Sequence, residues 1–147
     1  MKNNMKKILI ITLFFVFALA NASFSQLLVG KLENGQPTLT AKKAKLLTSL
    51  NTNLPKASGI NGNFNDVTIV KIQDNYFLTF KGEKYKSTFS IQVQGVDMYV
   101  QPVTVTCTTS DCADEELGCI PSGTKCTACG NKGKCTKTIS NGALISN

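Results

Sequence analysis

Six cysteines lie within 29 residues of this 147-residue chain, and they restrict its folding more than any other feature. Such a density is typical of a segment held together by disulfides. The count is even and the chain contains no His, which favours disulfides over metal ligation. We therefore predict three disulfides in a Cys-rich tail of residues 107–147, with a pairing that the spacing leaves open. The cysteines are Cys107, Cys112, Cys119, Cys126, Cys129 and Cys135.

Two other uses of the thiols stay open. The spacings Cys107-x4-Cys112 and Cys126-x2-Cys129 are loosely similar to those of a zinc ribbon, although two cysteines then have no role. A redox role for Cys126 and Cys129 is the second possibility. Reactive pairs of this kind begin a helix, whereas the glycine-containing segment 130–134 that follows here disfavours one. A thiol-based metal-binding or redox protein is therefore the alternative hypothesis.

The first 22 residues have the pattern of a secretory signal peptide. Three lysines precede an apolar run from Ile8 to Ala20, which is too short to span a bilayer as a helix and continues into the small-residue motif Ala20-Asn21-Ala22. We expect cleavage between residues 22 and 25, because Ser23-Phe24-Ser25 offers a second motif. An uncleaved anchor is disfavoured, because polar residues interrupt the apolar stretch after Ala20. We therefore expect a secreted or periplasmic protein with no transmembrane segment after signal cleavage.

All 16 basic residues are Lys, and with nine acidic residues they give a formal net charge of +7. Removal of residues 1–22 leaves 13 Lys in 125 residues and lowers the net charge to +4. These lysines are spread along the chain without Arg or regularly interleaved aromatic residues, so we expect no nucleic-acid binding. An unidentified macromolecule or an anionic surface is the expected partner.

A helix is predicted over residues 38–53, after a turn at 33–36. Small and apolar residues recur at three- and four-residue steps from Ala41 to Leu50. The predicted helix ends near Asn53, because Pro55 disfavours helical geometry in the residue before it.

From residue 66 the period of the apolar residues changes to two, which predicts strands. Runs rich in β-branched and aromatic residues cover 67–72 and 76–80, and a clean alternation covers 85–94. In that alternation Phe89 and Ile91 share the core face, while Lys86 and Thr88 are expected on the opposite, solvent-facing side. A fourth run begins at Val96, and its parity switches at Pro102, which predicts a bulge or an edge.

These patterns predict an α+β fold in which one helix is followed by a four-stranded antiparallel β-meander, with a small disulfide-rich C-terminal tail. Residues 23–106 then form the helix-plus-sheet domain, between the signal peptide at 1–22 and the tail at 107–147. A body of this size buries only a modest core, so stabilisation by disulfides or by a partner is expected.

Conventional catalysis lacks its usual residues here. Without His, a Ser or Thr nucleophile has no common general base, and the acids Asp66, Asp74, Glu83 and Asp97 fall at predicted turns and strand ends, where they are solvated. The acidic stretch 111–116 lacks the spacing of a calcium loop. We therefore predict no catalytic residues, no cofactor and no metal site. The expected function is that of a secreted non-enzymatic binding or structural module, stabilised by disulfides in its tail.

Overall fold

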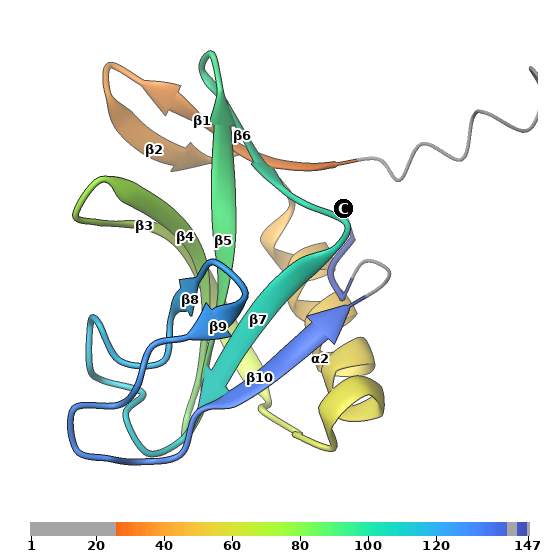
Figure 1. The fold of residues 1–147 in the computed structure, drawn as a ribbon. Helices are drawn as coiled ribbons and strands as arrows, with labels where there is room; N and C mark the ends of the chain where they lie inside the picture. Colours follow the sequence, from red (N-terminus) through yellow and green to blue (C-terminus); the bar gives the residue numbers. More distant parts are fainter. Residues whose placement is uncertain (1–25, 141–143, 147) are drawn as a thin grey trace, which may run out of the picture.

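The structure is a computed structural model that describes residues 26–140 and 144–146. The predicted signal peptide at 1–22 and its cleavage region at 22–25 lie outside the described residues. The described residues form one antiparallel sheet, a helix on its inner face and, on its outer face, the part of the Cys-rich tail between residues 110 and 135 (Figure 1).

Eight strands make up the sheet, and every pairing between them is antiparallel. A short hairpin of two further strands belongs to the Cys-rich tail. The strands of the sheet are β1 (Leu27–Glu33), β2 (Gln36–Leu39), β3 (Phe64–Ile72), β4 (Asn75–Gly82), β5 (Lys86–Gln94), β6 (Asp97–Val100), β7 (Thr104–Thr109) and β10 (Thr136–Ser140), those of the hairpin are β8 (Pro121–Ser122) and β9 (Lys125–Cys126), and the helix is α2 (Lys43–Ser58).

The central strand β5 organises the sheet, which divides beside it. One edge of β5 pairs with β4, whereas the other edge pairs with β7 over residues 86–89 and with β6 over residues 92–94. The break between β6 and β7 contains Pro102, which has no N–H to donate to a ladder. On one side of this break β6 pairs with β1, and on the other side β7 pairs with β10. Because β2 packs against β3, the strands β1–β6 form a nearly closed barrel (Figure 1).

The α+β class is confirmed, but the prediction of a four-stranded sheet is wrong. The four predicted runs correspond to β3, β4, β5 and β6, and the sheet continues into β1, β2, β7 and β10. The missed hairpin β1–β2 turns at Asn34 and Gly35, whose φ angles are 52° and 78°. Positive φ at both central residues is typical of the type I′ turn, whose backbone twist matches that of the flanking strands. The missed strands β7 and β10 are rich in Thr, a β-branched residue that suits a strand without being apolar.

The predicted helix over 38–53 is wrong at both ends. Thr38 belongs to β2, and α2 continues through Pro55 to Ser58. Proline removes one helical N–H, but Leu46, Leu50 and Leu54 are all fully buried at four-residue steps, and this packing stabilises the last turn. The helix ends at Gly59, whose φ of 74° is left-handed and whose N–H donates to the Pro55 carbonyl.

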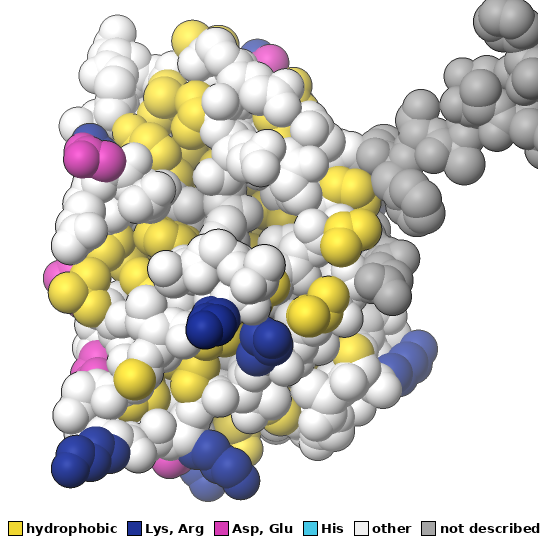
Figure 2. All heavy atoms as spheres, viewed as in Figure 1, with side chains coloured by type: hydrophobic (Ala, Val, Ile, Leu, Met, Phe, Trp, Pro, Cys, Tyr) yellow, Lys and Arg dark blue, Asp and Glu magenta, His cyan; other side chains and the backbone are white. Residues whose placement is uncertain are grey.

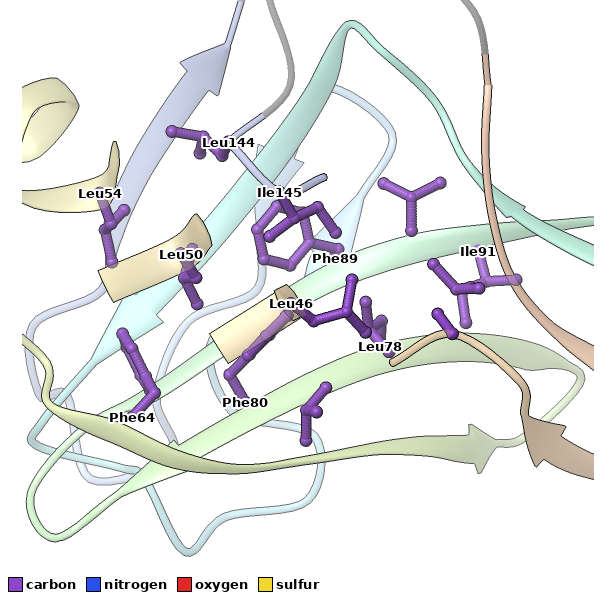
Figure 3. Packing of buried hydrophobic residues seen from close by; sticks show 14 of the residues in the cluster. Leu46, Leu50, Leu54, Phe64, Leu78, Phe80, Phe89, Ile91, Leu144 and Ile145 are labelled. Carbon is purple, nitrogen blue, oxygen red and sulfur yellow. The ribbon is translucent and has the colours of Figure 1, made fainter. Parts of the chain in front are cut away.

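The main core lies between α2 and the inner face of the sheet (Figure 3). Leu46, Leu50 and Leu54 project from the helix onto aromatic side chains of the strands. Phe80 contacts both Phe64 and Phe89 edge to face, with ring centroids 6.2 and 5.6 Å apart. Such pairs contribute about 1 kcal/mol beyond the area that they bury. The remaining members of the core are Val29, Ala41, Val67, Leu78, Ile91, Met98, Val100, Leu144 and Ile145.

The outer face of β3, β4 and β5 is also covered, by the Cys-rich tail. Ile120 of the tail packs with Ile72 and Phe77 of the sheet in a second apolar cluster. The expectation that Lys86 and Thr88 face solvent is therefore wrong, since their side chains are buried beneath the tail, with 5% and 0% exposed. The inner face of β5 follows the prediction at Phe89 and Ile91.

Replacement of Leu50 by Ala is expected to lower the free energy of unfolding by about 2–5 kcal/mol, because it leaves a cavity in the main core. Urea denaturation of the oxidised protein measures this loss. The matched control is Leu117→Ala, at a leucine that is 54% exposed, and its expected effect is within about 0.5 kcal/mol. Equal losses in the two variants would contradict the assignment of the core.

Candidate functional site

Three disulfides join the six cysteines in a fully interleaved order, which confirms the predicted disulfides. Along the chain, the first cysteine pairs with the fourth, the second with the fifth and the third with the sixth. The bonds close segments of 16–19 residues, and each contributes about 3 kcal/mol in the chain-entropy account. The pairs are Cys107–Cys126, Cys112–Cys129 and Cys119–Cys135.

The sulfur atoms of two disulfides lie side by side. The Sγ atoms of Cys107, Cys126 and Cys135 are within 4.8 Å of one another, although Cys135 is bonded to Cys119. Thiolates bind metals and disulfide sulfurs do not titrate, so reduction would have to precede metal ligation here. Cys126 and Cys129, considered above as a redox pair, are bonded to other cysteines and not to each other.

Two carboxylates of the acidic stretch fasten the tail to itself. The Glu115 carboxylate accepts the N–H groups of Gly130 and Asn131, at 2.7 and 3.3 Å. The Asp111 carboxylate accepts the N–H of Lys134 at 2.7 Å, and this bond is the main reason that the pKa of Asp111 lies below its ordinary value. These two acids therefore join the loop 111–118 to the loop 130–134.

Lys86 joins the same loop to the sheet. Its Nζ donates to the carbonyl oxygen of Gly118 at 3.0 Å and to that of Glu115. Burial lowers the pKa of Lys86 below its ordinary value of 10.5, and the positive charge of Lys81 lowers it further. The negative charges of Glu115 and Asp114 raise the pKa, but their effect is smaller. The ion pairs among the described residues, Lys31–Asp97 and Lys43–Asp66, involve other lysines. Lys86 is thus a buried cation that backbone dipoles hold without a direct carboxylate partner.

A cleft of about 360 Å³ opens between the outer face of the sheet and the loop above Lys86. Its apolar walls come from β3 and from the tail, whereas β4 and β5 supply Thr and Lys side chains. Its volume is within the range of small-ligand sites. The lining residues are Val70, Lys71, Ile72, Thr79, Lys81, Lys86, Thr88, Ala113, Asp114, Glu115, Glu116 and Ile120.

Other hollows in the described part of the chain lack a buried charged side chain. One lies on the polar face of α2 around Thr48 and Thr52, and another beside β7 and β10 around the exposed Val103 and Ile139. On the face seen in Figure 2, lysine side chains are spaced over the lower half, with hydrophobic side chains between them. The cleft above Lys86 is therefore the candidate site.

Comparison of the chain with family models, curated proteins and solved structures gave no match. Within residues 26–140 and 144–146, no helix has the length and apolar character that crossing a bilayer requires. The site is therefore interpreted from its own residues.

The disulfide pairing predicts one peptide pair that is diagnostic. Digestion of the non-reduced protein with trypsin and Glu-C is expected to release residues 117–125 joined only to residues 135–137, through Cys119–Cys135. Cleavage after Glu116, Lys125 and Lys134 separates these peptides from the remaining cysteines. Mass spectrometry before and after reduction identifies the pair, and recovery of 117–125 joined to 126–132 would contradict the interleaved order.

The lowered pKa of Lys86 predicts a pH dependence of stability. As the pH rises from 7 toward 10.5, the folded protein releases the Lys86 proton before the unfolded chain does, so the free energy of unfolding rises. Below the folded-state pKa this gain is absent. Urea denaturation of the wild type and of Lys86→Met over this range should show the wild type gaining stability relative to the variant. Lys84→Met is the control for removing an exposed lysine, and an unchanged or opposite difference would refute the assignment.

Proposed function

We propose that this chain is an exported, non-enzymatic binding module that receives its ligand in the cleft between β3–β5 and the Cys-rich tail. The cleft itself carries the proposal, because it is a preformed hollow with apolar walls and a buried cation at its floor. Interleaved disulfides and the carboxylates of Asp111 and Glu115 hold its outer wall in place. A rigid wall lowers the entropy lost on binding.

Export is supported by two independent features. The signal-peptide pattern of residues 1–22 directs a chain out of the cytoplasm. Three disulfides form and persist in oxidising compartments, which include the periplasm and the cell exterior. The proposed location is therefore the periplasm or the exterior.

A binding role is supported over catalysis by the two hydrogen bonds that Lys86 donates, which oppose the lowering of its pKa by burial. Two carbonyl oxygens accept hydrogen bonds from its Nζ, and such acceptors favour the ammonium form. An ammonium group has no lone pair for nucleophilic attack. The carboxylate of Glu115, which also lines the cleft, is occupied by two backbone N–H groups. The groups at the floor of the cleft thus suit recognition.

The second candidate function is thiol chemistry after reduction. The close approach of the Cys107, Cys126 and Cys135 sulfurs favours it, since three thiolates within 4.8 Å of one another suit a soft metal ion. Counting free thiols in the exported protein distinguishes the two functions. Six thiols with bound zinc would support this candidate, and three disulfides support the binding module.

Phenylacetamide, a neutral aromatic probe, tests occupancy of the cleft. Its addition to the mature protein is expected to shift the methyl NMR signals of Val70, Ile72 and Ile120, which line the walls. Ala113→Phe places a ring in the cleft and should abolish these shifts. The matched control is Ala128→Phe, at an exposed alanine of the tail outside the cleft, which should leave them unchanged. Equal shifts in Ala113→Phe, or absence of shifts in the wild type with both phenylacetamide and the phenylacetate anion, would overturn the proposal.

A further inference from the structure

Lys86 has an unused hydrogen-bond donor at the floor of the cleft. An ammonium group carries three N–H bonds, and two of them are directed to the carbonyl oxygens of Glu115 and Gly118. Among the described residues no third acceptor lies within hydrogen-bond distance of Nζ, and no carboxylate forms an ion pair with it. A buried ammonium group with one unpaired N–H and no carboxylate partner is stabilised when an anion binds to it.

Thr88 supplies a second unused group beside it. The side chain is fully buried, lines the cleft and has an Oγ1 without a hydrogen-bond partner among the described residues. Thr88 follows Lys86 by two positions on β5, so both side chains project from the same face of the strand. A buried hydroxyl without a partner is costly, and a ligand oxygen would remove this cost.

The other lining residues indicate the chemical character of the part of the ligand that lies away from Lys86 and Thr88. Val70, Ile72 and Ile120 form apolar walls, which favour a hydrocarbon group. The lining also includes the exposed acids Asp114 and Glu116 and the exposed lysines Lys71 and Lys81. Three acidic residues of the lining offset its three lysines, and this balance favours a singly charged anion over a multiply charged one such as phosphate. One ammonium N–H and one hydroxyl provide two donors, which match the two oxygens of a carboxylate.

We propose that the ligand of the cleft is a carboxylate attached to an apolar group, with its oxygens at Lys86 Nζ and Thr88 Oγ1 and its hydrocarbon part between the walls. This inference rests on the proposed function and specifies the ligand class of the same site. A free amphipathic acid and the C-terminal residue of a peptide share this chemistry, and the test distinguishes them.

Binding of phenylacetate and of phenylacetamide, measured by NMR titration of the mature protein, tests the ligand class. The two probes have the same size and differ in charge. Phenylacetate is expected to bind about tenfold more tightly or better, because a charge-assisted hydrogen bond to Lys86 forms only with the anion. Equal affinities would overturn the carboxylate proposal and leave the proposed function standing. Binding of neither probe would overturn both.

Two variants test the assigned atoms. Lys86→Met is expected to abolish the preference for phenylacetate. Thr88→Val keeps the shape of the side chain and should weaken phenylacetate binding about threefold to tenfold, without lowering the melting temperature, because the hydroxyl has no partner in the free protein. Lys84→Met, outside the cleft, should change neither the affinity for phenylacetate nor the preference for it over phenylacetamide. Unchanged phenylacetate binding by Thr88→Val would overturn the placement of the carboxylate, even if Lys86→Met fails to fold.

A third comparison, with a short peptide, distinguishes a peptide C-terminus from a free acid as the ligand. Acetyl-Gly-Gly-Phe with a free C-terminal carboxylate is compared with its C-terminal amide and with phenylacetate. Tighter binding of the free peptide than of phenylacetate supports a peptide terminus as ligand, and the reverse order supports a free acid. A peptide amide that binds as tightly as the free peptide would count against carboxylate recognition.

Discussion

Interleaved disulfides hold the loop 111–120 against the outer face of the sheet, and the rest of the structure depends on this attachment. A single helix covers only the inner face of a sheet. Here Ile120 packs on Ile72 and Phe77, and the loop carbonyls lie over Lys86. The tail therefore completes a third layer, which gives a small chain a second buried face and creates the cleft at the margin of that layer.

Glu115 forms hydrogen bonds to two different segments, one through its backbone and the other through its side chain. Its carbonyl oxygen accepts from Lys86 in the sheet, while its carboxylate accepts from Gly130 and Asn131 in the following loop. One residue thus links three segments. The Glu115 carboxylate forms no ion pair with the ammonium group, so backbone carbonyls are the groups in direct contact with Lys86 Nζ, while the charges of Glu115 and Asp114 act on it from a distance.

Much of the sheet could be predicted, because Phe89 and Ile91 alternate with polar residues and the even cysteine count indicated three disulfides. The turn at Asn34-Gly35 was an available signal for the hairpin β1–β2. The helix extended past Pro55 because the burial of Leu54 outweighs local propensity, which a sequence pattern does not measure. The site could not be predicted, since an alternating strand has the same sequence pattern whether water or a distant loop covers its polar face. The disulfide pairing determines which loop covers that face here, and the cysteine spacing left the pairing open.

Leu144 and Ile145 pack in the main core, and the Leu144 carbonyl accepts hydrogen bonds from Ser49 and Asn53 of α2. These residues, together with β10 and Cys135, follow the helix and the other strands of the sheet along the chain. A growing chain lacks one strand of the sheet, part of the core and one partner of a disulfide until synthesis has passed residue 145. The main core and the Cys119–Cys135 disulfide are therefore both completed by residues 135–140 and 144–145. Packing of the core and oxidation of the tail are thus coupled through the same short part of the chain.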